Sequence, residues 1–199
     1  MELVPLLGRA VALALAAGVN VYATVALIGF AVRFDWVALP AEYQVFGSNL
    51  VIGAAVTLYF VEFVADKVPW IDSVWDLVHT AVRPIGGAFI AVTAMGEASP
   101  GATAAAALLG GAVATSSHVT KAGTRAMANT VPEPFSNWAL SLGEDAFVLG
   151  LGYLALQYPA AALVVALAVL LAILAFSVVL IRAAGRWLGR WRQPAPALH

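Results

Sequence analysis

Ionisable and amide side chains gather in two stretches of an otherwise apolar chain. The first stretch carries Glu62, Asp66, Asp72, Asp76, His79 and Arg83. The second carries His118, Lys121, Arg125, Asn129, Asn137, Glu144 and Asp145. Most neighbours within a stretch are three or four residues apart, a spacing that places side chains on one face of a helix. We therefore predict that each stretch presents a polar helix face, and that these faces together form a binding site.

Two kinds of ligand match these residue types. Carboxylates combined with a histidine bind hard divalent cations or relay protons. The predicted metal ligands are Glu62, Asp66, Asp76 and His79. Basic side chains bind an anionic head group or a phosphate instead, and the candidates are Arg83, Lys121 and Arg125. Asn20, in the first apolar segment, is a further candidate, with an interhelical hydrogen bond as the alternative.

The plainest alternative is that the charges neutralise one another. A charged side chain at the centre of a bilayer costs about 2.5–3.5 kcal/mol on the mildest scale, so buried charges need partners. Asp76 with Arg83, and Glu144 or Asp145 with Lys121 or Arg125, would suffice. In that case the charges clamp the helices together and bind no substrate.

The composition indicates a membrane protein. Of 199 residues, 62% are hydrophobic and 11% are charged, whereas soluble domains carry about 25% charged residues. A membrane-spanning helix needs about 20 apolar residues. Six segments qualify: 6–32, 47–67, 72–95, 101–128, 136–157 and 159–182. We predict an all-α membrane protein of about six transmembrane helices, in which residues 1–185 form a single polytopic domain.

The distribution of basic residues predicts the orientation of the chain, because cytoplasmic segments carry an excess of Lys and Arg. Residues 186–199 form a basic and aromatic tail, which we place on the cytoplasmic side. Counting six crossings back places the N-terminus on the same side, together with Val68-Pro69 and Val131-Pro132. The chain has no cysteine, which excludes disulfides, and its net charge of −1 argues against a nucleic-acid partner.

A shift of 63 residues aligns residues 65–77 with residues 128–140. Ala, Val, Pro, Ser, Trp and Leu match without a gap, and each copy contains one Val-Pro pair. Because proline removes a backbone donor and clashes with the preceding turn, each pair is expected to break its helix. The alignment predicts an internal repeat of the parallel class that some transporters contain. An inverted repeat is the alternative, and it requires one of the intervening segments to be re-entrant, for which Arg83-Pro84 with Gly86-Gly87 offers a break.

The chain resembles a bacterial integral membrane family known as domain of unknown function 4126. The resemblance is carried by Gly18-Val-Asn20-Val-Tyr22, Glu62-Phe-Val-Ala-Asp66-Lys67-Val-Pro69, Asp72-Ser-Val-Trp-Asp76, His79-Thr-Ala-Val-Arg83-Pro84, Ser117-His118-Val-Thr-Lys121-Ala-Gly-Thr-Arg125, Asn129-Thr-Val-Pro132-Glu133-Pro134, Ser136-Asn137 and Glu144-Asp145. It covers the chain up to about residue 155. The resemblance implies a location in the bacterial inner membrane and importance of these motif residues, and it implies no activity.

Three functions are compatible with these features. The first is a small transporter, channel or lipid flippase for an ionic or anionic substrate, because intramembrane charges and broken helices mark transport pathways. The second is a membrane-embedded enzyme that acts on a lipid phosphate or diphosphate, with a divalent cation as its cofactor. The third is a non-catalytic assembly protein held by ion pairs. Membrane lipids are the expected partners, and small residues such as Gly110-Gly111 allow packing within one chain or in a homo-oligomer.

Overall fold

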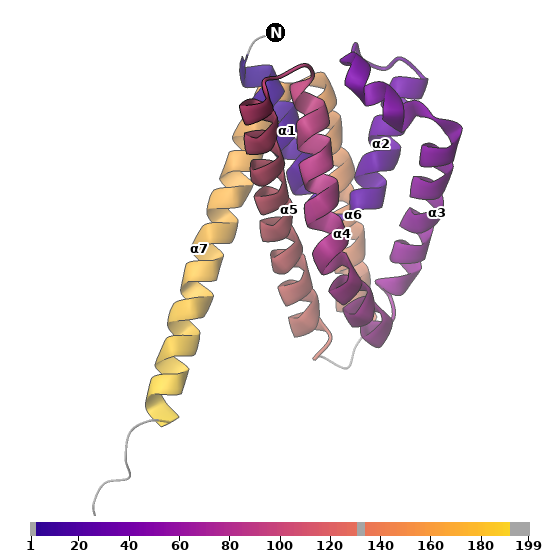
Figure 1. Ribbon diagram of the computed structural model, residues 1–199. Helices are drawn as coiled ribbons and strands as arrows, with labels where there is room; N and C mark the ends of the chain where they lie inside the picture. The colour runs from indigo at the N-terminus through magenta and orange to yellow at the C-terminus, as the bar shows by residue number, and fades with distance from the viewer. Residues whose placement is uncertain (1–2, 131–133, 192–199) are drawn as a thin grey trace, which may run out of the picture.

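The structure is a computed structural model that describes residues 3–130 and 134–191. The described residues form helices and no strand. The helices are α1 Leu3–Val19, α2 Val21–Arg33, the 3-10 helix η1 Ala41–Gly47, α3 Asn49–Ala65, α4 Pro69–Met95, α5 Pro100–Ala128, α6 Pro134–Gln157 and α7 Pro159–Trp191. They pack as one bundle from which the far half of α7 projects (Figure 1). The chain is thus an all-α protein, as its composition predicts.

Fewer helices can cross a membrane than the six predicted. Among the described residues, four are long and apolar enough: Trp70–Met95, Pro100–Ala128, Phe135–Gln157 and Pro159–Val179. A fifth span results if η1 and α3, which meet at 61°, are counted as one. The predicted first span, 6–32, is in fact divided into α1 and α2, each of which is too short to cross alone.

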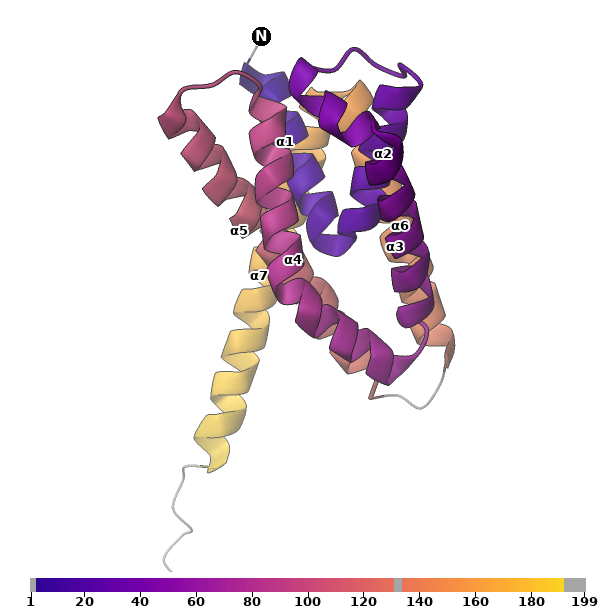
Figure 2. The ribbon, with the colours of Figure 1, turned by 45° about the vertical axis from the view of Figure 1, so that its right-hand side comes forward.

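Helices α1 and α2 form a hairpin that enters the bundle and returns to the same end (Figure 2). The outer part of α1 lies against the α6–α7 turn, where Gly8 contacts the backbone of Pro159. The chain beyond α2 returns to this turn, because the Gln157 side chain donates a hydrogen bond to the Trp36 carbonyl at 3.2 Å. The tip of the hairpin lies deep in the bundle, where Gly18 contacts Ala114 and Ser117 of α5.

Asn20 explains why the hairpin turns where it does. Its backbone is extended, with φ −149° and ψ 100°, and its side-chain oxygen accepts a hydrogen bond from the Ala23 N–H at 2.9 Å. Asparagine is among the preferred residues at this capping position because its side chain satisfies a backbone donor that lacks a helical partner. Asn20 therefore ends one helix and begins the next within a single residue.

The hairpin changes the predicted topology. Because it returns to the end at which it enters, the start of α1 and the end of α7 lie at opposite ends of the bundle (Figure 1). The prediction that both termini lie on one side of the membrane counted residues 6–32 as one crossing, and the division into α1 and α2 removes that crossing from the count. The basic and aromatic tail begins inside α7, which continues to Trp191, and residues 192–199 lie outside the described part.

The first Val-Pro pair separates two helices rather than bending one. Val68 precedes α4, and Pro69 occupies its first turn, where a missing N–H costs no hydrogen bond. The second pair, Val131-Pro132, lies outside the described residues. Helices α3 and α5 end at Ala65 and Ala128, which are equivalent under the 63-residue shift, and both ends lie at the same end of the bundle (Figure 1). The repeat itself stays a prediction.

Helix α1 is the centre of the bundle although it is the first helix in the chain. All of residues 10–19 are buried, and α1 packs against α4, α5, α6 and α7. Alanine and glycine on α1 allow the surrounding helices to approach closely. Helix α4 contains Pro84 and changes direction along its length in Figure 2, as expected of a proline inside a helix.

Gly18→Ala is expected to lower the free energy of unfolding by about 1–3 kcal/mol, because the added methyl group overpacks the tip against the α5 backbone. The measurement is reversible unfolding in detergent micelles. Gly53→Ala is the matched control: a Cβ at Gly53 meets nothing within 4 Å, so this change should leave stability equal or slightly higher. Equal effects of the two substitutions would contradict the close contact at the tip.

Candidate functional site

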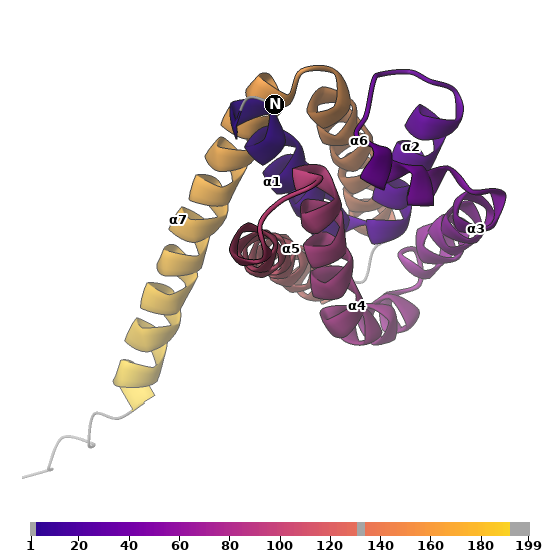
Figure 3. The ribbon, with the colours of Figure 1, turned by 45° about the horizontal axis from the view of Figure 1, so that its top comes forward.

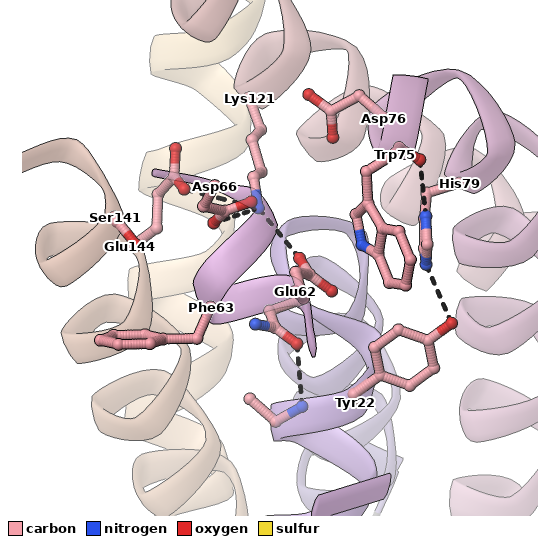
Figure 4. A network of polar contacts seen from close by, with 12 residues as sticks. Tyr22, Glu62, Phe63, Asp66, Trp75, Asp76, His79, Lys121, Ser141 and Glu144 are labelled. Carbon is pink, nitrogen blue, oxygen red and sulfur yellow. Dashed lines mark hydrogen bonds and ion pairs between the residues drawn. The ribbon is translucent and has the colours of Figure 1, made fainter. Parts of the chain in front are cut away.

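A network of buried charges lies between the tip of the hairpin and the linked ends of α3–α4 and α5–α6. We call it the charge network, and it comprises Glu62, Asp66, Asp72, Asp76, Arg83, Lys121, Arg125, Glu144 and Asp145. Figure 4 shows Glu62 at its centre, with Lys121, Asp66 and Glu144 to one side and Trp75, His79 and Tyr22 to the other. The members come from α3, from the adjoining link, and from α4, α5 and α6.

Arg83 joins α4 to three other helices. Its guanidinium lies 2.8 Å from Glu62 Oε1 and 3.2 Å from Asp76 Oδ1, and the side chain is completely buried. It also approaches the Gly18 carbonyl at 3.5 Å, at the C-terminal end of α1, where helical carbonyls lack partners. His118 of α5 accepts a further hydrogen bond from Arg83 at 2.7 Å. The guanidinium thus ties the tip of the hairpin to the carboxylates.

Lys121 and Arg125 lie one turn apart on α5 and share their acids. Lys121 Nζ lies 3.0 Å from Glu62 Oε1, 3.3 Å from Asp66 Oδ2 and 3.5 Å from Glu144 Oε2. Arg125 Nη2 lies 3.0 Å from Asp66 Oδ2 and 2.7 Å from Glu144 Oε2. Arg125 Nε also donates to Glu144 Oε1 at 3.2 Å, which makes the Arg125–Glu144 pair bidentate.

Both histidines lie inside the network of hydrogen bonds. His79 Nδ1 lies 2.7 Å from the Trp75 carbonyl, which can only accept, so this nitrogen carries a proton. His79 Nε2 lies 2.9 Å from the Tyr22 hydroxyl, which can donate or accept. His118 Nδ1 faces Arg83, which can only donate, so the His118 proton lies on Nε2, 3.2 Å from Thr80 Oγ1. Each ring nitrogen has a protein partner.

Two acids of the network have no basic partner among the described residues. Asp72 Oδ2 accepts from Asn129 Nδ2 at 3.1 Å, and Asn129 in turn accepts from Asn137 Nδ2 at 2.9 Å. Asp145 lies beside the hairpin tip, where Asn20 Nδ2 is 3.5 Å from its Oδ1 and the Tyr59 side chain interacts with it. Both carboxylates are buried, with 1% and 9% of their residue surfaces exposed.

Several buried acceptor oxygens have no protein donor in the described part of the chain. They are Glu62 Oε2, Asp66 Oδ1, Asp72 Oδ1, Asn137 Oδ1 and Asp145 Oδ2. Burial raises the pKa of the Asp66 carboxyl above its ordinary value, while the Lys121 and Arg125 cations act in the opposite direction. A buried polar group without a partner is costly. These oxygens therefore have unused capacity for a proton or a cation.

The structure brings all fourteen predicted site residues into one region, but it does not group the predicted metal ligands. Among the residues described, no three His, Asp or Glu side chains form a group that could hold a metal. The reason is that Glu62, Asp66 and Asp76 face Arg83, Lys121 and Arg125, while His79 uses both nitrogens within the protein. The acids are neutralised by bases rather than gathered around an ion.

Residues that the helical spacing did not single out also make polar contacts around the charge network. Ser117 donates to the Leu15 carbonyl at 2.9 Å, one turn before α1 ends at Val19. Thr80 links His118 to the Asp76 carbonyl, and Lys67, at the rim, donates to the Phe63 carbonyl at 2.8 Å. Uncharged serine and threonine residues in apolar helices commonly bond to their own backbone, so spacing alone does not distinguish Ser117 and Thr80, although both lie in motifs that carry the family resemblance.

Two pockets reach the network from different sides. One, of about 260 Å³, lies between α4 and α5 and is lined by Asp72, Asp76, Thr80 and Arg125 among others. The second, of about 330 Å³, lies between α1, α5, α6 and α7 and reaches Lys121 and Glu144. We call the second one the lateral pocket. The network is therefore connected both to a polar pocket and to an apolar one.

Comparison with known proteins identifies the family of this chain. No curated protein matches the chain, and no solved structure matches it. One family model matches residues 7–179, a range that includes the hairpin and the whole charge network. The motif residues that carry the resemblance thus lie within the matched part. The chain belongs to the family described as Domain of unknown function (DUF4126).

Proposed function

We propose that this protein is a small membrane transporter that moves a cation, and that protonation of buried carboxylates accompanies the movement. The observation that carries the proposal is the hairpin, whose tip ends inside the bundle against the charge network. Transporters place their sites where interrupted helices meet near the middle of the membrane, because the unpaired helix ends and nearby charges bind ions. A purely structural clamp requires no such interruption.

The balance of charges favours a cation over an anion. Six carboxyl groups in the network face three buried bases, Arg83, Lys121 and Arg125, and Lys67 adds one more base at the rim. Every one of the three buried bases already contacts a carboxylate. Among the described members of the network, the buried side-chain atoms without a partner are four carboxylate oxygens, on Glu62, Asp66, Asp72 and Asp145, and one donor, Arg83 Nε. An anion would find a single N–H of a base that already pairs with carboxylates, whereas a cation or proton would find several free oxygens.

The basic residues support an orientation in the membrane. Lys67, Lys121, Arg125 and Arg182 lie toward the end where α3 joins α4, whereas Arg9 and Arg33 lie toward the other end. Because basic residues concentrate on the cytoplasmic side, the α3–α4 link and the end of α7 face the cytoplasm, and α1 begins on the outer side. The inner membrane of a bacterium is the proposed location.

Asp145→Asn is expected to reduce cation-dependent currents at least tenfold, because it removes the one acid at the hairpin tip that has no basic partner. The measurement is solid-supported-membrane electrophysiology on proteoliposomes, with jumps in pH and in monovalent cation concentration. The asparagine side chain keeps the size of the aspartate, so folding should persist. Unchanged currents in this variant would contradict the proposal.

Asp35→Asn is the matched control for that experiment. Asp35 lies in the exposed loop after α2 with φ 49°, a conformation that asparagine also tolerates. The same chemical change there should leave the currents as they are. If neither the unmodified protein nor this control carried current under any ion tested, the transport proposal would fail as a whole.

A further inference from the structure

The lateral pocket has one apolar wall and one charged end. Its apolar lining includes Leu15 and Val19 of α1, Leu140 and Phe147 of α6, and Val169 and Ile173 of α7. Ser117, Lys121 and Glu144 lie at its polar end. Ligand pockets commonly combine a mostly apolar wall with a few polar groups that fix orientation. The volume of about 330 Å³ is at the small end of the range for organic ligands.

Helices α6 and α7, which line one side of the pocket, also carry exposed residues next to it. Helix α7 packs on the bundle through Ala162 and Ala166 and then leans away from it (Figure 3). Farther along α7, Leu171 and Leu174 are 66% and 61% exposed. Gly143 of α6 lies on the pocket wall, and a Cβ there would meet nothing within 4 Å. A hydrophobic molecule in the membrane therefore has a lateral path to this wall.

Glu144 is the carboxylate of the charge network that can contact a bound cation while the bases keep other acids. It is the most accessible of the paired acids, with 16% of its side chain exposed, against at most 9% for the others. Its basic partners also have other acids: Asp66 pairs with both Lys121 and Arg125, and Glu62 pairs with Lys121. A cation that contacted Glu144 would therefore leave neither base without a carboxylate.

We propose that the lateral pocket binds a hydrophobic organic cation, with its apolar part against α6 and α7 and its charge toward Glu144. This inference rests on the proposed function and names the class of its substrate. Two charged residues line the pocket, and Glu144 is the accessible one, with 16% of its side chain exposed against 2% for Lys121. The ring of Phe147 adds a surface that attracts cations. A hydrophobic anion has the same apolar fit but meets the exposed acid rather than the buried base.

The test compares two probes of the same shape and opposite charge, tetraphenylphosphonium and tetraphenylborate. Equilibrium binding is measured on the full chain in detergent, with empty micelles subtracted. Tetraphenylphosphonium should bind saturably, and tetraphenylborate should not. Glu144→Gln should weaken binding of the cation about tenfold, which corresponds to about 1.4 kcal/mol. Equal binding of both probes would overturn the charge assignment.

Two glycines of α6 make the location testable without touching a charge. Gly143→Leu fills the lateral pocket and should abolish binding of tetraphenylphosphonium. Gly150→Leu adds the same side chain two turns along the same helix face, also into open space but outside the lining, and should leave binding unchanged. Equal affinities of the two variants for tetraphenylphosphonium would show that the lateral pocket is not the binding site.

The two proposals can fail separately. If tetraphenylphosphonium did not bind while the pH-driven and cation-driven currents persisted and depended on Asp145, the substrate class proposed here would be wrong and the transport function would stand. Binding that followed the Gly143 and Glu144 variants in a protein without any current would establish the pocket and remove the transport function.

Discussion

Arg125→Met is expected to lower the free energy of unfolding by about 3–5 kcal/mol, the usual loss when one partner of a buried ion pair is removed. Arg125 contacts two carboxylates and the carbonyls of Asp66 and Asn137, so it connects α5 both to α6 and to the link after α3. Methionine fills much of the same space and leaves Glu144 and Asp66 short of a base. Unfolding in detergent micelles, followed by circular dichroism, measures the loss.

Two further variants separate the loss of the ion pair from the loss of packing. Arg33→Met makes the same change at an exposed position and should alter stability by less than about 0.5 kcal/mol. Arg125→Met combined with Glu144→Met removes both charges, and it should recover part of the stability because fewer buried acids then lack a partner. If the loss of unfolding free energy in the double variant equalled the sum of the losses in the two single variants, the pairing would contribute little.

Glu62→Gln is expected to free the C-terminal half of α3 from the bundle and to lower stability by about 3 kcal/mol. Helix α3 buries only Ala55, Glu62 and Ala65. A groove of about 600 Å³ lies between α3 and α4, and one of about 370 Å³ lies between α2, α3 and α6. With so little packing, the contacts of Glu62 Oε1 with Arg83 and Lys121 hold this half to α4 and α5, and the pairs of Asp66 hold only its end.

Pulsed electron-electron spin resonance can follow the movement of α3. The chain has no cysteine, so nitroxides at Val61→Cys in α3 and Leu142→Cys in α6 require no other change. Both side chains are exposed, at 43% and 56%. Glu62→Gln should lengthen and broaden the distance distribution, whereas Glu97→Gln, at an exposed acid, should not. A narrow, unchanged distribution would show that packing rather than the ion pairs holds α3.

Spacing along single helices predicted part of the charge network. Asp76 and Arg83 are seven residues apart on α4, so helical periodicity places them on one face two turns apart, and the structure pairs them. The pairing of Glu144 with Arg125 was among the alternatives that neutralisation suggested, and the structure contains it. Asp145, which was an equal candidate for those bases, instead lies beside Asn20. Adjacent residues on a helix point about 100° apart, and only the packing of the neighbouring helices decides which one meets a base.

The hairpin could not be predicted from hydropathy. Residues 6–32 are long and apolar enough to read as one span, and the single Asn20 hardly changes such an average. The local signal was Gly18 followed by Asn20, a small residue before a good N-cap. What makes the break favourable is tertiary: Gly18 fits against α5, and Arg83 approaches the Gly18 carbonyl at the end of α1. Ser117 of α5 adds a hydrogen bond to the Leu15 carbonyl one turn earlier. None of these partners is near in sequence.

The central position of α1 has a consequence for the order in which this protein is built. The ribosome makes α1 first, yet the walls that enclose residues 10–19 include α6 and α7, which it makes last. Neither α1 nor α2 is long enough to serve as a stable anchor across the bilayer by itself. The enclosure of residues 10–19 is therefore incomplete until α6 and α7 are in place. The earliest helix of the bundle reaches its buried position only after the later ones have been made.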